Sequence, residues 1–509
     1  MNMRQDSAKA WENRLKVYSS IVRDAVRQRQ WALAESLISI SGRFAERMVL
    51  GLYADAEIER FLLSRAASLA EPVPRTCDEN SVLMVMSEAY LYGGHTRVVE
   101  RWIETDRSRR YSLAVTRQGR NEFPVRLTEA VARSGGVVRF FNETDSADSR
   151  AAELRSWSMD FSCVVLHTHP DDIVPVLAYG IGSFPRPVGL YNHADHRMWL
   201  GASIVDCVGE LRQWGRDITV NFRGVPRSMV IGIPGDGAAS VPVGREEARR
   251  MLKIREDRRL VVSAGAAYKY NPIPGMDFLD VVVPLLERRA DIEVVVLGVT
   301  FAGRPDWKII SDRFDGRLMA LDSVGHEDFM KWMAAADLVL NSMPLPGFTT
   351  IADAIDAGTP VLLVETPAGL MDWMYGSAMI CRDNDALLAR ALAILSDHSL
   401  ALGIVADVRR RLSAERTQEM FLSRVNSFFS RLRENGHCIR SIAQSAIRPS
   451  SFEEAIFRVS TVDPREVARA LYREAFGKWA RQTVRICCAL WPIRTPFYFI
   501  KWIFHGCKS

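Results

Sequence analysis

The stretch from residue 344 to 362, PLPGFTTIADAIDAGTPVL, carries residue types that can hold an anion. Gly347 lets the backbone approach a ligand closely, and Thr349 and Thr350 stand where a helix is expected to begin, in front of the positive end of the helix dipole. Asp353 lies one turn further on, close enough to accept a hydrogen bond from a sugar hydroxyl attached to that anion. An ordinary helix start, with a threonine as N-cap, would show the same residue pattern.

A second segment, SAGAAYKYNP at 263–272, could complete this site. Gly265 opens a loop of small residues at a strand end, and Lys269 on that loop could place its ammonium on a diphosphate facing the helix start. A lysine in such a loop, taken alone, is usually a surface residue. His326 precedes the helix that leads to the strand before the opening stretch, where it would line a base pocket or merely cap the helix.

Histidines that could handle a proton follow strands in the first half of the chain. In YLYGGHTRVVERWI a two-glycine turn brings His95 to a helix start, which favours the neutral imidazole that a general base requires. In YNHADHRMWLG the residues His193, Asp195 and His196 cluster at a strand end. An aspartate beside a histidine orients the ring and supports its protonated form.

These side chains are also metal-ligand types. HTHPDD at 167–172 ends another strand, so His167 and His169 could join the cluster, either as acceptor contacts or as metal ligands. The segment has neither an i, i+4 histidine pair on one helix nor a thiolate beside it, which a zinc site would favour. We therefore expect no metal and no cofactor.

Apolar runs of strand length alternate with helical stretches from residue 81 onward. The runs are 82–86, 111–116, 137–141, 163–169, 187–193 and 228–233, then 260–265, 292–298, 316–322, 338–342 and 360–365. Continuous apolar strands separated by helices predict parallel sheets covered on both faces. The Gly- and Pro-containing stretch 234–244 separates two such series, so an α/β fold of two doubly wound lobes is expected, with ligands bound at the carboxyl ends of the strands.

Four domains follow from this pattern. Helical spacing of apolar residues from 7 to 69 predicts an all-helical domain at 1–75. The first Rossmann-like lobe covers 80–234, and the second covers 244–430. A helical extension follows at 431–509.

The end of that extension combines cations with aromatic rings. No acidic residue follows Glu474, and lysines and arginines are interleaved with Trp, Tyr and Phe. This composition suits an interfacial helix on an anionic membrane surface. An aromatic helix packed across the two lobes is the alternative.

Composition narrows the class of protein. The 509 residues are 48% apolar and 25% charged, with a net charge of +5, which does not favour a nucleic-acid binder. Eight scattered cysteines fit a reducing compartment. The N-terminus lacks a signal-peptide pattern, and no apolar run reaches the roughly 20 residues of a membrane span. A cytoplasmic protein, peripheral on the inner membrane, is the resulting expectation.

The order of these motifs resembles the nucleotide-binding half of GT-B glycosyltransferases. The run FTT-x-x-D-x-x-x-AGTP is similar to the O-GlcNAc transferase family and its bacterial adhesin-glycosylating relatives, and the resemblance spans roughly residues 81–425. It implies a GT-B fold whose first lobe, 80–234, holds the acceptor and whose second lobe, 244–430, binds a nucleotide sugar. By motif position, it also implies that Lys269, Thr349 and Thr350 hold the donor diphosphate and that Asp353 binds the ribose.

One departure from the family pattern concerns the mechanism. Retaining GT-B enzymes commonly carry E-x7-E, and the position eight residues before Asp353 is Leu345. An inverting transfer is therefore expected, from a UDP-sugar to an envelope glycan or a lipid-linked acceptor, with His95 or His193 and His196 as base. Three alternatives remain: a protein glycosyltransferase that docks a polypeptide on its helical domain, a nucleotide-sugar epimerase of the same fold, and a non-catalytic nucleotide-sugar-binding protein.

Overall fold

The computed structural model describes residues 2–91, 94–235, 243–273, 275–366, 370–443, 446 and 464–473. By its contacts the chain divides into two units, one of residues 1–48 with 461–509 and one of residues 49–460. The smaller unit contains helices α1 (Asn2–Val26) and α2 (Trp31–Met48), with a helix over 464–473. Tyr18 and Phe44 stack between α1 and α2, with ring centroids 6.4 Å apart. This pair of helices confirms that the apolar spacing in this part of the chain indicates helix.

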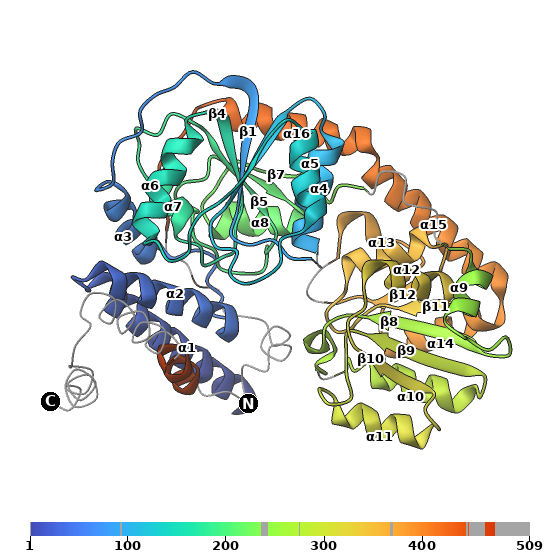
Figure 1. The fold of residues 1–509 in the computed structure, drawn as a ribbon. Coiled ribbons are helices and arrows are strands. Elements are labelled where there is room, and N and C mark those ends of the chain that lie inside the picture. The colour runs from blue at the N-terminus through green and yellow to red at the C-terminus, as the bar shows by residue number, and fades with distance from the viewer. Residues whose placement is uncertain are drawn as a thin grey trace, which may run out of the picture. The chain divides into compact units, whose positions relative to one another are not determined.

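The first lobe of the larger unit is a seven-stranded parallel sheet in the order β3-β2-β1-β4-β5-β6-β7 (Figure 1). Its strands are β1 (Asp78–Met86), β2 (Arg110–Val115), β3 (Val138–Phe140), β4 (Phe161–His167), β5 (Val188–Asn192), β6 (Cys207–Glu210) and β7 (Ser228–Val230). Its helices are α4 (Gly94–Thr105), α5 (Val125–Arg133), α6 (Ala147–Ser158), α7 (Val174–Tyr179) and α8 (Gln213–Phe222). Residues 82–86 of β1 are fully buried, as expected for a strand with helices on both faces.

The second lobe repeats this architecture with six parallel strands in the order β10-β9-β8-β11-β12-β13. The strands are β8 (Arg259–Ala264), β9 (Ile292–Leu297), β10 (Leu318–Leu321), β11 (Leu338–Leu340), β12 (Val361–Val364) and β13 (Ile380–Cys381). Helices and 3-10 turns cover it: α9 (Arg245–Met251), η1 (Ala267–Tyr270), α10 (Leu279–Arg288), α11 (Pro305–Arg313), α12 (His326–Ala335), α13 (Phe348–Asp356), η2 (Asp372–Met374), α14 (Asn384–Ser396) and α15 (His398–Arg416). The prediction of two doubly wound lobes is confirmed.

Two strands were not predicted. β6 spans only Cys207–Glu210, and β13 only Ile380–Cys381, so neither forms the continuous apolar run that marks the other strands. Both lie toward one edge of their sheet, where short strands suffice to complete the pairing.

Helix α3 (Ala56–Ala66), which the sequence placed in the helical domain 1–75, packs on the first lobe. The Arg155 guanidinium of α6 donates to the carbonyls of Ala66 and Ala178, at 2.9 and 2.7 Å, and so joins the end of α3 to α7. Arg65 also pairs with Asp148 of α6. The contacts therefore separate the chain near residue 48, ahead of the predicted domain boundary at residue 75.

Helix α16 (Gln418–Arg433) returns from the second lobe to the first. Figure 1 shows it, in orange, against the sheet of the first lobe, where Phe428 and Phe429 pack edge-on around Trp102 of α4. A Cβ at Gly189 of β5 would lie 2.6 Å from the Phe428 ring, so this position must be bare. The predicted second lobe, 244–430, thus ends in a helix that completes the core of the first.

The basic aromatic segment after Glu474 lies outside the described residues. In the described part of the chain no single helix has the length and hydropathy to cross a membrane; α14 together with α15–α16 meets both measures, with a bend of 115° between them.

Candidate functional site

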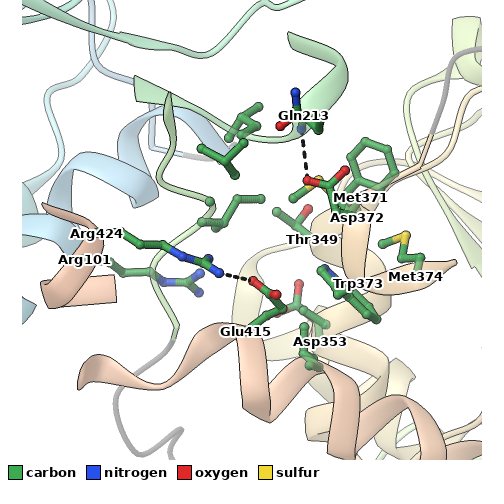
Figure 2. A pocket seen from close by; sticks show the side chains of 17 residues that line it. Arg101, Gln213, Thr349, Asp353, Met371, Asp372, Trp373, Met374, Glu415 and Arg424 are labelled. Atoms are coloured by element: carbon green, nitrogen blue, oxygen red, sulfur yellow. Dashed lines mark hydrogen bonds and ion pairs between the residues drawn. The ribbon is translucent and has the colours of Figure 1, made fainter. Parts of the chain in front are cut away.

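A cavity of about 340 Å³ is lined by residues of both lobes (Figure 2). Its first-lobe residues lie after β6, at or after the end of β7, or on α4. Its second-lobe residues lie on α13 and around η2, and helices α15 and α16 supply the rest. They are Arg101, Leu211, Gln213, Val230, Gly232, Ile233, Phe348, Thr349, Ala352, Asp353, Met371, Asp372, Trp373, Met374, Leu412, Glu415 and Arg424. The cavity therefore lies beyond the carboxyl ends of the strands, where open α/β sheets bind ligands.

The predicted anion motif forms the start of α13. Gly347 is the N-cap, and a glycine has no side chain to accept from the first backbone N–H groups of the helix. Asn341 fixes the turn: its Oδ1 accepts from the Gly347 N–H at 2.9 Å and its Nδ2 lies 3.3 Å from the Gly347 carbonyl. Thr349 and Asp353 line the cavity. The helix start is thus not the ordinary threonine N-cap that the sequence left open.

Lys269 lies beside this helix start, on η1. Its Nζ is 3.5 Å from the carbonyl of Pro346, and its own carbonyl accepts from the Leu345 N–H at 3.3 Å. Burial lowers the pKa of Lys269. A Cβ at Gly265 would lie 3.2 Å from Lys269 Cδ, so the bare glycine makes room for the lysine stem. Lys269 and Gly265 border the α13 turn without lining the cavity itself.

Thr350 and His326 lie at the margin of the site. Thr350 is buried, and its Oγ1 would be 2.9 Å from a Cβ at Gly347, so it lies over the turn and does not line the cavity. His326 begins α12, and its Nε2 is 3.4 Å from Arg97 Nη2 on α4 of the first lobe. The pKa of His326 is lowered to about 4, mainly by burial and then by the positive charges of Arg97 and Arg101.

The start of α4 faces the start of α13. A Cβ at Gly94 would lie 3.8 Å from Thr349 Cγ2, which places His95 next to the anion motif. His95 Nε2 is 2.8 Å from the backbone carbonyl of His167. Its Nδ1 is buried and has no hydrogen-bond partner among the described residues. Burial, and then the charge of His169, lowers the pKa of His95 to about 4, so its ring is neutral near pH 7.

Three more histidines gather around His95. Its ring centroid lies 4.2 Å from that of His193 and 5.7 Å from that of His169. His167 Nδ1 is 2.9 Å from His193 Nε2, and both residues have a pKa well below the ordinary value because they are buried. The structure therefore brings together His95 and His193, which the sequence offered as alternative bases, and places His167 and His169 beside them.

Asp195 and His196 take other partners. Arg212 Nε donates to Asp195 Oδ2 at 2.6 Å, and this pair is buried. Hydrogen bonds from His196 and Arg212, with the charge of Arg212, keep the pKa of Asp195 below its ordinary value despite burial. His196 Nδ1 is 3.3 Å from Asp195 Oδ1, but its side chain is 44% exposed. Asp195 thus anchors Arg212 and His196, and the hydrogen bond that orients His193 comes from His167.

No protein-family model and no curated protein matches the sequence. The structure is similar to HepE of Anabaena solved in complex with UDP, at 14% identity over 69% of this chain and 99% of that chain, with a TM-score of 0.53. HepE with UDP-glucose covers the same shares at the same identity, with a TM-score of 0.51. A mutant O-GlcNAc transferase of Thermobaculum terrenum covers 84% of each chain at 14% identity, with a TM-score of 0.52. The chain has the GT-B fold.

Several cavity residues of this GT-B protein were not predicted from the sequence. Arg424 Nη2 donates to Glu415 Oε2 at 2.7 Å across α15 and α16, and the Gln213 N–H donates to Asp372 Oδ2 at 3.0 Å (Figure 2). Gln213 follows β6, so recognition of that short strand would have placed it at the site. Arg101, Glu415 and Arg424 lie on helices, and no local pattern distinguishes them from surface residues.

Metal ligation was the remaining alternative for the histidine cluster. Across the described ranges, no group of three His, Cys, Asp or Glu side chains has an arrangement that could hold a metal ion. Because burial lowers the pKa of His95, His167 and His193, their rings are neutral near pH 7 and can accept a proton or a hydrogen bond.

Proposed function

We propose that this GT-B protein is a glycosyltransferase that moves a sugar from a UDP-linked donor to an envelope glycan or a lipid-linked acceptor. The observation that carries the proposal is the start of α13: a glycine-capped helix places Thr349 and Asp353 in the cavity, opposite the start of α4 with His95. Helix starts of this kind bind anions through backbone N–H groups and the dipole.

The donor would lie along α13. Its diphosphate would accept from the first N–H groups of the helix and from Thr349, with Thr350 fixing the turn and the Lys269 ammonium supplying a point charge nearby. Asp353, one turn further, would accept from a ribose hydroxyl. HepE, which shares this fold, has been solved with UDP and with UDP-glucose, which supports a uridine donor here.

His95 is the proposed base. A backbone carbonyl only accepts hydrogen bonds, so the contact with the His167 carbonyl requires the proton of His95 to be on Nε2, which leaves the lone pair on Nδ1. Binding of the acceptor would bring its hydroxyl within hydrogen-bond distance of this buried Nδ1, which would take the proton while the acceptor oxygen bonds to the anomeric carbon. The bond from that carbon to the diphosphate breaks, and the departing diphosphate keeps the electron pair, stabilised by α13 and Lys269. Leu345, in place of a carboxylate, fits this single inverting displacement.

The place of the reaction is proposed from the sequence. The cationic, aromatic residues after Glu474 suit the anionic inner face of a membrane, where lipid-linked acceptors occur. We propose a cytoplasmic protein that binds this face peripherally.

Thermal unfolding of the full chain with a panel of nucleoside diphosphates and nucleotide sugars tests the donor. A ligand at 100 times its Kd stabilises the folded state by about 2.7 kcal/mol, so UDP and one UDP-sugar should raise the Tm. We expect Lys269→Ala and Asp353→Asn to lose most of this shift. Asp356→Asn, on the same helix and away from the cavity, is the matched control and should retain it.

Product analysis separates the proposal from its rivals. Transfer requires an acceptor, whereas an epimerase would convert the donor alone, and a sugar added to a protein would show as a mass increment on that protein. A UDP shift without turnover of any donor would indicate a binding protein. No shift with any nucleotide would contradict the whole proposal.

A further inference from the structure

We propose that polar side chains at the carboxyl ends of β1, β2 and β4, next to His95, form a subsite for a neutral sugar ring of the acceptor. This inference rests on the proposed function and names the substrate class on the acceptor side. The subsite consists of Glu88, Tyr90, Arg117, Asn121, His169 and Asp171.

Contacts between aromatic rings connect the subsite to the proposed base. The His95 and His169 rings lie edge to face, with centroids 5.7 Å apart. His169 in turn stacks on Tyr90, with ring planes only 6° apart and centroids at 5.8 Å. A sugar bound beside the Tyr90 and His169 rings would therefore lie next to the His95 ring. The stacked rings also offer apolar faces with polar edges, which suits the mixed surface of a sugar.

The polar groups provide both kinds of hydrogen-bonding partner. Tyr90 Oη donates to Glu88 Oε2 at 2.9 Å, and Asn121 Nδ2 donates to Glu88 Oε1. Burial and Glu88 raise the pKa of Tyr90, so its hydroxyl keeps its proton. Arg117 pairs with Asp171, with Nη1 3.2 Å from Oδ2. Sugar hydroxyls donate and accept at once, so they match carboxylates, an amide, a phenol and a guanidinium better than any single ion would.

The charge of the subsite argues against a phosphate. Glu88 and Asp171 carry two negative charges against one positive charge on Arg117, and the buried Asp172 lies beneath them, accepting from Ser87 and Thr116 at 2.6 Å each. A phosphorylated group here would be repelled by like charges. The glycan portion of the acceptor, not a phosphate linker, therefore fits this place.

The loops that carry the subsite are held in place. Gln118 accepts from the Ala89 N–H at 3.0 Å and donates to the Ala89 carbonyl at 2.8 Å, which ties the loop after β2 to the loop after β1. The His169 N–H donates to Ser87 Oγ at 2.8 Å, which ties in the loop after β4. Such anchoring lowers the entropic cost of binding a sugar.

An oligosaccharide array tests the inference with the full chain and UDP present. The array carries neutral oligosaccharides, phosphorylated oligosaccharides and a set of peptides. We expect binding to neutral glycans, and about tenfold weaker binding by Glu88→Gln and by Tyr90→Phe, since each loses a hydrogen bond to a charged group. Glu129→Gln, an exposed glutamate on α5, is the matched control and should bind like the wild type.

The outcomes separate this inference from the proposed function. If UDP raises the Tm and both variants bind neutral glycans like the wild type, the subsite is wrong while the donor proposal stands. Binding only to phosphorylated glycans, only to peptides or to no array member would also overturn it. If no nucleotide binds and Glu88→Gln still weakens glycan binding, the donor proposal fails and the subsite remains.

Discussion

At the scale of the residue, one hydrogen bond sets the tautomer of His95, and burial keeps its ring neutral. The His167 carbonyl fixes the proton on Nε2, and burial keeps the ring from gaining a second proton near neutral pH. Both effects favour a base over an acid. The same hydrogen bond depends on a backbone atom, so no side-chain substitution at residue 167 can remove it directly.

The pKa of His95 predicts the acid limb of the reaction. A base must be unprotonated, and the pKa of His95 is lowered to about 4, so kcat/KM should stay level from pH 8 down to about 5 and fall as the pH approaches 4. His95→Gln should lower kcat about 10²- to 10⁴-fold with the UDP-induced Tm shift unchanged. His398→Gln, exposed on α15, is the control. An acid limb at the ordinary histidine pKa would point to another base.

At the scale of the element, α4, β4 and β5 bring their ends together and bury a group of neutral imidazoles. The pKa values of His95, His167 and His193 all lie below the ordinary value of 6.5 because the surroundings are desolvated. The unfolded chain has no such burial, so its histidines titrate at their ordinary pKa.

This difference makes the unfolding free energy depend on pH. Below pH 6.5 the unfolded chain binds protons that the folded chain does not, so stability is present above that pH and falls as the pH drops from 6.5 toward 4. His193→Gln should reduce the slope by at most about 1.4 kcal/mol per pH unit, measured by urea unfolding between pH 7 and 5. Equal slopes for wild type and His193→Gln would contradict the assignment.

A second feature at this scale is the packing of α16 against the sheet of the first lobe. Gly189 of β5 and Gly209 of β6 leave space for Phe428: a Cβ at Gly189 would lie 2.6 Å from its ring, and one at Gly209 would lie 3.6 Å from it. The helix therefore rests directly on strand backbone.

Gly189→Ala should destabilise the protein by about 1–3 kcal/mol, because the new methyl group overpacks the Phe428 ring. In combination with Phe428→Leu the cost should be smaller than the sum of the two single costs, since the leucine frees space. Urea unfolding measures all three. Gly182→Ala, where a Cβ would meet no atom within 4 Å, is the control. Strict additivity would mean that the two positions do not touch.

At the scale of the whole molecule, the chain crosses between the lobes more than once. After the second lobe is complete, α16 joins the first, and the segment after it remains there: the His437 ring makes hydrogen bonds to Asp206 and to the Tyr179 carbonyl, both at 2.9 Å. The described part of the larger unit thus ends on the first lobe, ahead of the cationic segment.

Removal of the residues after Glu474 should abolish membrane binding. In sedimentation with vesicles of anionic lipid, the full chain should pellet and the truncated chain should remain soluble, because the removed residues carry the aromatic rings and the cations. High salt should weaken binding of the full chain, and neutral vesicles should bind it less. Equal sedimentation of both chains would contradict the membrane proposal.

The sequence by itself determined the elements whose signals are local. Apolar runs predicted eleven of the strands and their parallel arrangement, because most positions of a strand covered on both faces are buried and require apolar residues. Glycine, paired threonines and an aspartate at helical spacing marked the start of α13, because the conformation and charge of a helix start depend on neighbouring residues.

Only the tertiary structure decided what depends on residues far apart in the chain. Helix α16 packs on the first lobe, and Asp195 pairs with Arg212. Arg101 and Glu415 line the cavity. The tertiary structure also selected His167 as the partner of His193 and gave His95 its tautomer. Hydrogen bonds and burial of this kind form only where strand ends and helices from distant parts of the chain come into contact. The spacing of residues along the chain does not determine which of these segments contact one another.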